Sequence, residues 1–235
     1  MLRRSEFFMI DPNIIVALDF PSTKEALQLV EQLDPKLCRI KIGCELFYKE
    51  GPEIVEKISG LGFSVFLDLK LHDIPNTVAS AIKSLLPLKP WMISIHALGG
   101  ITMMKAALEA SRSSPKPPLL TAVTVLTSLD NAQAQEIFAT DASVMAIRLA
   151  KMAEKAGCPA LVTSAHEIPL FKERLQHKPR FVVPGIRLEK SDDDQKRVAT
   201  PKEAWAAGAD FLVIGRPITR AKDPLAVLRA LYGPA

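Results

Sequence analysis

Short apolar runs alternate with longer amphipathic segments along the chain. The runs are rich in β-branched residues and several lack strict polar alternation, which is typical of parallel strands covered on both faces. They cover residues 14–18, 39–43, 64–69, 91–97, 119–126, 160–164, 180–186 and 210–216. This pattern predicts eight buried strands.

The segments between the runs have apolar residues at spacings of three and four, which predicts helices. The clearest segments cover residues 22–33, 51–62, 76–88, 141–157 and 200–210. Helix-end signals support them, because Ser22 and Glu25 have the spacing of a capping box and Gly157 stands where a helix C-cap belongs. Pro201 suits a first helical turn after Thr200 as N-cap. The alternation predicts an α/β protein with a (β/α)₈ TIM barrel, and an open doubly wound sheet is the alternative.

The domain organisation follows from the continuity of this pattern. Linkers, repeats and low-complexity segments that would divide the chain are not found, so we expect a single barrel domain over residues 1–235. Residues 1–10 are expected to form a surface arm. The polar segment 185–197 directly follows the seventh run, at the catalytic rim of such a barrel, and predicts a lid loop over residues 185–200.

Composition narrows the classes of function. The chain has 235 residues with 30 Lys and Arg against 26 Asp and Glu, a net charge of +4 that is too small for a nucleic-acid-binding footprint. Apolar residues make up 48% and charged residues 24%, which excludes intrinsic disorder for the bulk of the chain. Cys38, Cys44 and Cys158 contain no Cys-x-x-Cys pair, so we expect a reducing cytoplasm. The sequence gives no reason to expect a membrane span.

Polar groups gather where the predicted strands end, which is where barrel enzymes place their chemistry. Seven of the eight runs supply them: Asp19, Lys41, Asp68, Lys70, Asp73, His96, Thr127, Ser128, Arg187, Gly215 and Arg216.

The third run, in DLKLHDIPNT, is the most informative. Asp68 and Lys70 are two residues apart and share a strand face, and Asp73 follows in the loop. With Lys41 close to Asp68, an alternating Lys–Asp–Lys–Asp array becomes possible, in which each charge keeps its neighbours ionised. A lysine held protonated cannot form a Schiff base, but it can deliver a proton to a carbanion. A surface salt-bridge ladder is the alternative interpretation.

Two Gly-Arg elements, GIR at 185–187 and IGR at 214–216, predict a phosphate site. They follow the seventh and eighth strands, the usual phosphate position of this fold. Gly215 allows close approach of the backbone to an anion, and Arg187 and Arg216 offer forked donors that match phosphate oxygens. A plain loop is the alternative for either element alone.

Taken together, these motifs resemble those of the orotidine 5′-phosphate decarboxylase family. The residues that carry the resemblance are VALD, RIKIG, DLKLHDIPNT, LTS, VVPGIR, DQKRVATP and VIGRPIT, in that order over about residues 13–224. The resemblance implies a barrel that works as a homodimer with sites at the subunit interface. It also implies conversion of orotidine 5′-phosphate to uridine 5′-phosphate and CO₂, the last step of de novo pyrimidine biosynthesis. No metal or organic cofactor is expected to take part, and neither nucleic acid nor a membrane is expected as a partner.

The resemblance also implies roles for individual residues. Lys70 would protonate carbon 6, and Asp68 would sit beside the substrate carboxylate. Asp19 and Lys41 would bind ribose hydroxyls. The remaining assignments are partner-site contacts by Asp73, Ile74 and Thr77, pyrimidine contacts by Thr127 and Ser128, and phosphate contacts by Arg187, Gln195, Gly215 and Arg216, with Gln195 on the lid.

Two other functions are compatible with the same residues. One is a Mg²⁺-dependent sugar-phosphate aldolase or decarboxylase on a similar barrel, since Asp68 and Asp73 could bind the metal. The other is a catalytically silent nucleotide-binding barrel, which the intact Asp68, Lys70 and Asp73 argue against.

Overall fold

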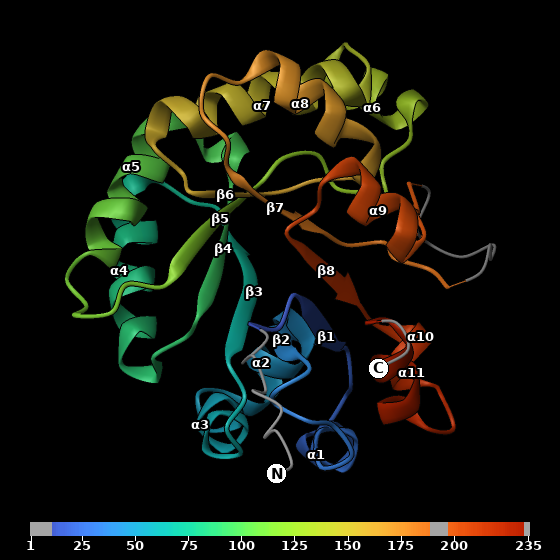
Figure 1. The fold of residues 1–235 in the computed structure, drawn as a ribbon. Coiled ribbons are helices and arrows are strands. Elements are labelled where there is room, and N and C mark those ends of the chain that lie inside the picture. Colours follow the sequence, from blue (N-terminus) through green and yellow to red (C-terminus); the bar gives the residue numbers. More distant parts are fainter. Residues whose placement is uncertain (1–10, 189–196, 233–235) are drawn as a thin grey trace, which may run out of the picture.

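The strands run parallel and close into a barrel in chain order. A computed structural model describes residues 11–188 and 197–232, so the expected arm at 1–10 and Gln195 lie outside the described residues. Neighbouring strands pair from β1 through β8, and β8 pairs with β1 (Figure 1). This confirms the α/β TIM barrel and excludes the open doubly wound sheet. The strands are β1 Ile14–Leu18, β2 Arg39–Gly43, β3 Val65–Leu71, β4 Met92–His96, β5 Leu119–Val123, β6 Ala160–Val162, β7 Arg180–Val183 and β8 Phe211–Ile214.

Helices form an outer layer around the barrel (Figure 1). They are α1 Thr23–Val30, α2 Cys44–Glu50, α3 Glu53–Gly60, α4 Pro75–Leu85, α5 Gly100–Ser111, α6 Asn131–Phe138, α7 Ala142–Ala156, α8 Ile168–Arg174, α9 Pro201–Ala207, α10 Arg216–Thr219 and α11 Pro224–Ala230. The five predicted helical segments correspond to α1, α3, α4, α7 and α9. Within the described ranges, none of these helices combines the length and apolar character needed to cross a membrane.

The helix ends agree with the sequence signals except at α1. Ser22 accepts the backbone N–H of Glu25, but the Glu25 carboxylate accepts from the Ser22 hydroxyl, not from its backbone N–H. The predicted capping box is therefore only half formed. Thr200 caps α9 within a complete capping box, with Pro201 in the first turn. Gly157 ends α7 at φ +88°, a conformation that favours glycine.

Apolar side chains form two cores, one between strands and helices and one inside the barrel. The alternation of strand side chains assigns them, so that Ile93 and Ile95 of β4 face the helices while Met92 faces the interior. The inner core consists of Ile15, Ala17, Phe66, Met92, Val182, Phe211 and Val213. This packing fills the barrel below its carboxyl-end rim.

The amino end of the barrel holds a buried arginine. The Arg39 guanidinium lies 3.9 Å from the ring centroid of Trp91 and 5.4 Å from that of Phe211, and it forms an ion pair with Asp11. Stacking on aromatic faces is a favourable setting for a partly desolvated guanidinium. Arg39 thus continues the inner core toward the end opposite the predicted site.

Candidate active site

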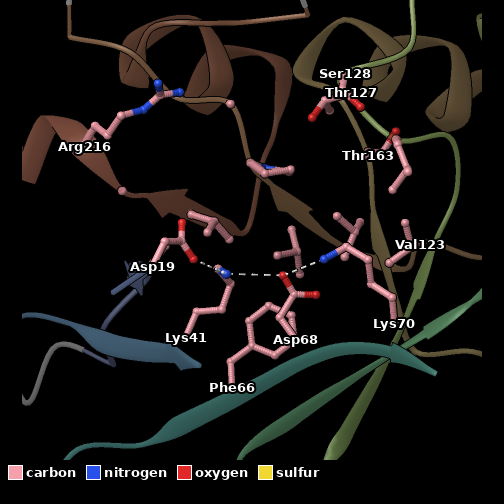
Figure 2. A pocket seen from close by; sticks show the side chains of 18 of the residues that line it. Asp19, Lys41, Phe66, Asp68, Lys70, Val123, Thr127, Ser128, Thr163 and Arg216 are labelled. Atoms are coloured by element: carbon pink, nitrogen blue, oxygen red, sulfur yellow. Dashed lines mark hydrogen bonds and ion pairs between the residues drawn. The ribbon is translucent and has the colours of Figure 1, made fainter. Parts of the chain in front are cut away.

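A cavity of about 440 Å³ opens at the carboxyl ends of the strands. The residues predicted at the rim that line it are Asp19, Lys41, Asp68, Lys70, Thr127, Ser128, Arg187, Gly215 and Arg216. Parallel strands that close into a barrel bring their carboxyl ends to one rim, so side chains from opposite halves of the sequence meet there (Figure 2). The size is in the range of small-molecule binding sites.

A row of alternating charges crosses one wall of this cavity. Lys41 Nζ lies 3.2 Å from Asp19 Oδ1 and 3.5 Å from Asp68 Oδ2. Lys70 Nζ lies 3.0 Å from the same Asp68 oxygen. Figure 2 shows the resulting order, Asp19–Lys41–Asp68–Lys70, in which Asp19 directly follows β1, Lys41 lies on β2, and the other two lie on β3. The Asp68 carboxylate is therefore shared by two ammonium groups.

Burial makes these charges interdependent. The Asp68 and Lys41 side chains are only 13% and 10% exposed. Burial alone would raise the pKa of Asp68, but the ammonium groups of Lys41 and Lys70 outweigh it and the pKa is lowered. Burial would likewise lower the pKa of Lys41, but Asp68 and Asp19 outweigh it and the pKa is raised. Both groups are therefore charged at neutral pH.

Lys70 occupies an unusual backbone position. Its φ is +48°, in the left-handed region that non-glycine residues rarely adopt, and this costs about 1–3 kcal/mol. The β3–β4 register shifts between Leu67 and Leu71 at the same place. The Lys70 side chain, 37% exposed, reaches the cavity at the end of the charged row (Figure 2). A strained residue that presents an ammonium group to a cavity is a candidate for chemistry.

The remaining polar groups lie at two separate places around the cavity. Arg216 lies on the side of Asp19, and Thr127 and Ser128 lie across the cavity on the side of Lys70 (Figure 2). Arg187 is almost fully buried, and its Nη1 donates to the Ile186 carbonyl at 2.9 Å. A ligand that spans the cavity would therefore meet the Arg216 guanidinium at one end and Lys70 at the other.

Asp73, Ile74 and Thr77 lie outside this cavity. Asp73 and Ile74 directly precede α4 and, together with Leu98, border a shallow open depression. Ile74 is 65% exposed. Thr77 is exposed on α4. The charged row within one chain thus ends in Asp19, and Asp73, expected as a member of the array, does not join it.

The described ends of the expected lid loop are tied to the barrel. The Arg187 N–H donates to the Ala199 carbonyl at 3.0 Å, close to the end of β7. Arg197 donates to the carbonyls of Val125 and Leu126, each at 2.9 Å, and forms an ion pair with the buried Glu167. Arg197 therefore connects the loop after β5 with the residues after β6.

Sequence reasoning missed several residues of the site. Thr163 and Arg220 line the cavity, and Ser94 on β4 donates a hydrogen bond to Asp68. The sixth run ends in Thr163-Ser164, so its polar ending was visible in the sequence, whereas Ser94 stands alone within an apolar strand and gives no signal. Glu167 also gave no signal, since its partner is distant in sequence.

A histidine pair lies beside the site. The His72 and His96 rings stack with centroids 5.4 Å apart. Burial, His72 and the Lys70 charge lower the pKa of His96 to about 4. The backbone N–H of Leu98 donates to His96 Nδ1 at 3.3 Å, which requires an unprotonated nitrogen. Among residues 11–188 and 197–232, no group of three or more His, Cys, Asp or Glu side chains is arranged to hold a metal ion.

The fold and the cavity define a (β/α)₈-barrel enzyme whose cavity is lined by a row of alternating charges and by arginines. The family model described as "Orotidine 5'-phosphate decarboxylase / HUMPS family" matches residues 12–231. The chain therefore belongs to this family, whose decarboxylase members are carboxy-lyases.

Individual relatives agree over nearly full length. The chain is 51% identical to orotidine 5′-phosphate decarboxylase of Dichelobacter nodosus over 220 residues, 93% of this chain and 96% of the relative. It is 49% identical to the protein of that name in Nitrosococcus oceani, over 93% and 95% of the two chains. The crystal structure of orotidine 5′-phosphate decarboxylase from Lactobacillus acidophilus is similar with a TM-score of 0.83 and 34% identity, covering 94% of this chain and 98% of that one.

Proposed function

We propose that this chain converts orotidine 5′-phosphate to uridine 5′-phosphate and CO₂, the last step of de novo pyrimidine biosynthesis. The observation that carries the proposal is the Lys70 ammonium, which Asp68 holds at 3.0 Å at the edge of the cavity. Family membership and the names of the relatives give the substrate and the reaction.

The proposed chemistry needs a stabilised carbanion and a proton. When the bond from carbon 6 to the carboxylate breaks, its electron pair stays on carbon 6 in the plane of the ring, where the π-system cannot delocalise it. A fixed ammonium beside that carbon stabilises the localised charge in a cavity that excludes water. Lys70 then gives its proton to carbon 6 and regains one from solvent. CO₂ and uridine 5′-phosphate are the products.

The rest of the charged row would organise the reacting end of the substrate. Asp68 would lie beside the departing carboxylate and hold Lys70 in place. Lys41 and Asp19, paired at 3.2 Å, would bind the ribose hydroxyls. Because Lys41 is buried and bonded on two sides, its ammonium is positioned before substrate arrives, which is the arrangement that stabilises a transition state most effectively.

The other end of the cavity suits a phosphate. Arg187, Gly215 and Arg216 would hold it, with Gln195 from a lid over residues 185–200. Thr127 and Ser128 would contact the pyrimidine, which fits their place across the cavity from Arg216 (Figure 2). Phosphate binding far from carbon 6 would provide binding energy that the enzyme uses to position the reacting end.

The chain is further proposed to act as a homodimer in the cytoplasm. Asp73, Ile74 and Thr77 are exposed and border or adjoin a shallow depression, so they are available to complete the site of a partner subunit. Ile74 is an exposed apolar side chain of the kind that interfaces bury. The cysteines are free thiols, in keeping with a reducing compartment.

A spectrophotometric assay tests the proposed function. Purified enzyme should lower the absorbance of orotidine 5′-phosphate as uridine 5′-phosphate forms, and a metal chelator should not change the rate. No absorbance change at micromolar enzyme contradicts the proposal. Mg²⁺-dependent turnover of a sugar phosphate would instead support the alternative lyase, and uridine 5′-phosphate binding without turnover would support the catalytically silent barrel.

A further inference from the structure

Ser94 lies on β4, next to the Asp68 and Lys70 end of the charged row. It is fully buried on β4, where Met92 also faces the interior and the intervening Ile93 faces the helices. A side chain two residues from Met92 points the same way, so the Ser94 hydroxyl is directed into the barrel toward the cavity floor. It does not itself line the cavity, and the proposed chemistry gives it no contact with substrate.

The Ser94 hydroxyl joins two residues of the site at once. The backbone N–H of Lys70 donates to Ser94 Oγ at 2.8 Å, and Ser94 Oγ donates to Asp68 Oδ1 at 2.8 Å. An amide nitrogen can only donate, so the single hydroxyl proton remains for the carboxylate. The direction of both hydrogen bonds is therefore fixed.

These two bonds complete the placement of Asp68. Its Oδ2 is shared by Lys41 and Lys70, and its Oδ1 accepts from Ser94. With both oxygens engaged, the carboxylate plane cannot rotate without losing a contact. A charge-assisted bond of this kind is also stronger than a neutral one.

The same hydroxyl supports the irregular backbone at Lys70. Leu67 pairs with Ile93 and Leu71 with Ile95, so four residue steps on β3 face two on β4. The extra residues leave the regular ladder, and Ser94 Oγ accepts the Lys70 N–H in place of a backbone carbonyl. The positive φ of Lys70 is thus held by a side chain of the neighbouring strand.

We infer that Ser94 is a positioning residue for the decarboxylation, which sets the Lys70 ammonium by fixing both the Lys70 backbone and the Asp68 carboxylate. The inference rests on the proposed function. Ser94→Ala removes both bonds with little change in volume. The Asp68 carboxylate can then rotate and the Lys70 backbone can relax, which moves the ammonium relative to carbon 6.

Thr121 provides a matched control. It is the Cα partner of Ser94 on β5, so it lies on the same side of the barrel wall, and it is equally buried. Among the described residues, Thr121 Oγ1 has no hydrogen-bond partner. Thr121→Val therefore removes an interior hydroxyl next to Ser94 without disturbing the charged row.

The experiment measures kcat and KM for orotidine 5′-phosphate in the wild type, Ser94→Ala, Ser94→Thr and Thr121→Val. Because a misplacement of about 1 Å lowers turnover by about 100-fold, we expect that loss in kcat for Ser94→Ala. Its KM should stay within about threefold, since the phosphate and pyrimidine contacts are unchanged. Ser94→Thr, which keeps the hydroxyl, should recover at least about a tenth of wild-type kcat, and Thr121→Val should stay within about twofold.

Three results would overturn the inference. One is a kcat for Ser94→Ala within about threefold of the wild type. Another is an equal loss in both variants, which would indicate a general packing effect. The third is a Ser94→Thr variant as inactive as Ser94→Ala although it binds uridine 5′-phosphate like the wild type. If Ser94→Ala does not fold, Ser94→Cys replaces it, because a thiol is a weak donor and the same loss is expected.

The two proposals can fail separately. A wild-type chain that does not decarboxylate orotidine 5′-phosphate overturns the proposed function, and the inference with it. An active wild type with an equally active Ser94→Ala overturns the inference alone.

Discussion

Replacing Lys70 with alanine should remove almost all turnover while leaving nucleotide binding largely intact. Lys70 Nζ lies 3.0 Å from Asp68 Oδ2, and its side chain is 37% exposed, so an effective dielectric constant of about 20 is appropriate. An ammonium about 4 Å from a carbanion then stabilises it by about 4 kcal/mol, which is about 10³-fold in rate. Loss of the proton donor should lower the rate by a further factor of about 10²–10⁴. The expected loss in kcat is therefore about 10⁵–10⁷-fold.

The assay follows the absorbance of orotidine 5′-phosphate, using protein made in a host that lacks this activity. Uridine 5′-phosphate affinity, measured by calorimetry, should change by less than about tenfold, because the arginines at the other end of the cavity remain. Lys83→Ala, on the exposed last turn of α4, is the control and should keep full activity. A Lys70→Ala variant with more than about 1% of wild-type kcat would refute this reasoning, because neither electrostatic stabilisation nor proton donation could then depend on this amine.

Three further predictions concern the partner subunit, the phosphate and the histidine pair. Mixing inactive Lys70→Ala and Asp73→Ala subunits should restore about a quarter of wild-type activity, because half of the random dimers then hold one intact site; no recovery after subunit exchange would contradict a shared site. Arg216→Ala should raise KM about 10–100-fold through loss of charge-assisted bonds, without affecting turnover of orotidine, which lacks the phosphate; an equal effect on orotidine would contradict this role. Burial, His72 and Lys70 lower the pKa of His96 from about 6.5 to about 4. Between these pH values His96 is protonated only in the unfolded state, so its contribution to the free energy of unfolding should be fully present above pH 6.5 and should be lost as the pH falls toward 4. The Tm of His96→Asn should fall less steeply over this range, and an identical slope would contradict the prediction.

The strands and much of the site could be predicted because both depend on local sequence. Each predicted run overlaps one strand of the barrel, although β3 extends beyond its run to Leu71, since buried parallel strands need short apolar β-rich segments whatever their partners. The rim followed from the rule that parallel strands place their carboxyl ends together. Lys41 and Asp68, far apart in the sequence, lie 3.5 Å apart for this reason alone.

Other features depend on contacts that the sequence does not display. Helix α5 was not predicted, because only Thr102, Lys105 and Glu109 mark the exposed face of its Gly100–Ser111 segment and most of the other residues are apolar or small. The positive φ of Lys70 depends on the register between β3 and β4, and one serine within an apolar strand does not reveal it. The Glu167–Arg197 pair joins two segments that no local pattern relates.

The filled interior of the barrel has a consequence for the way CO₂ would leave the site. Phe66, Met92 and Phe211 pack below the cavity, and Arg39 stacked on Trp91 continues this packing at the amino end. Among the described residues this packing closes the cavity toward the amino end, so in the proposed reaction CO₂ released beside Lys70 would leave at the carboxyl-end rim. Slow escape of CO₂ would allow it to recombine with the carbanion, so in the proposed mechanism rapid protonation of carbon 6 would make each bond cleavage irreversible.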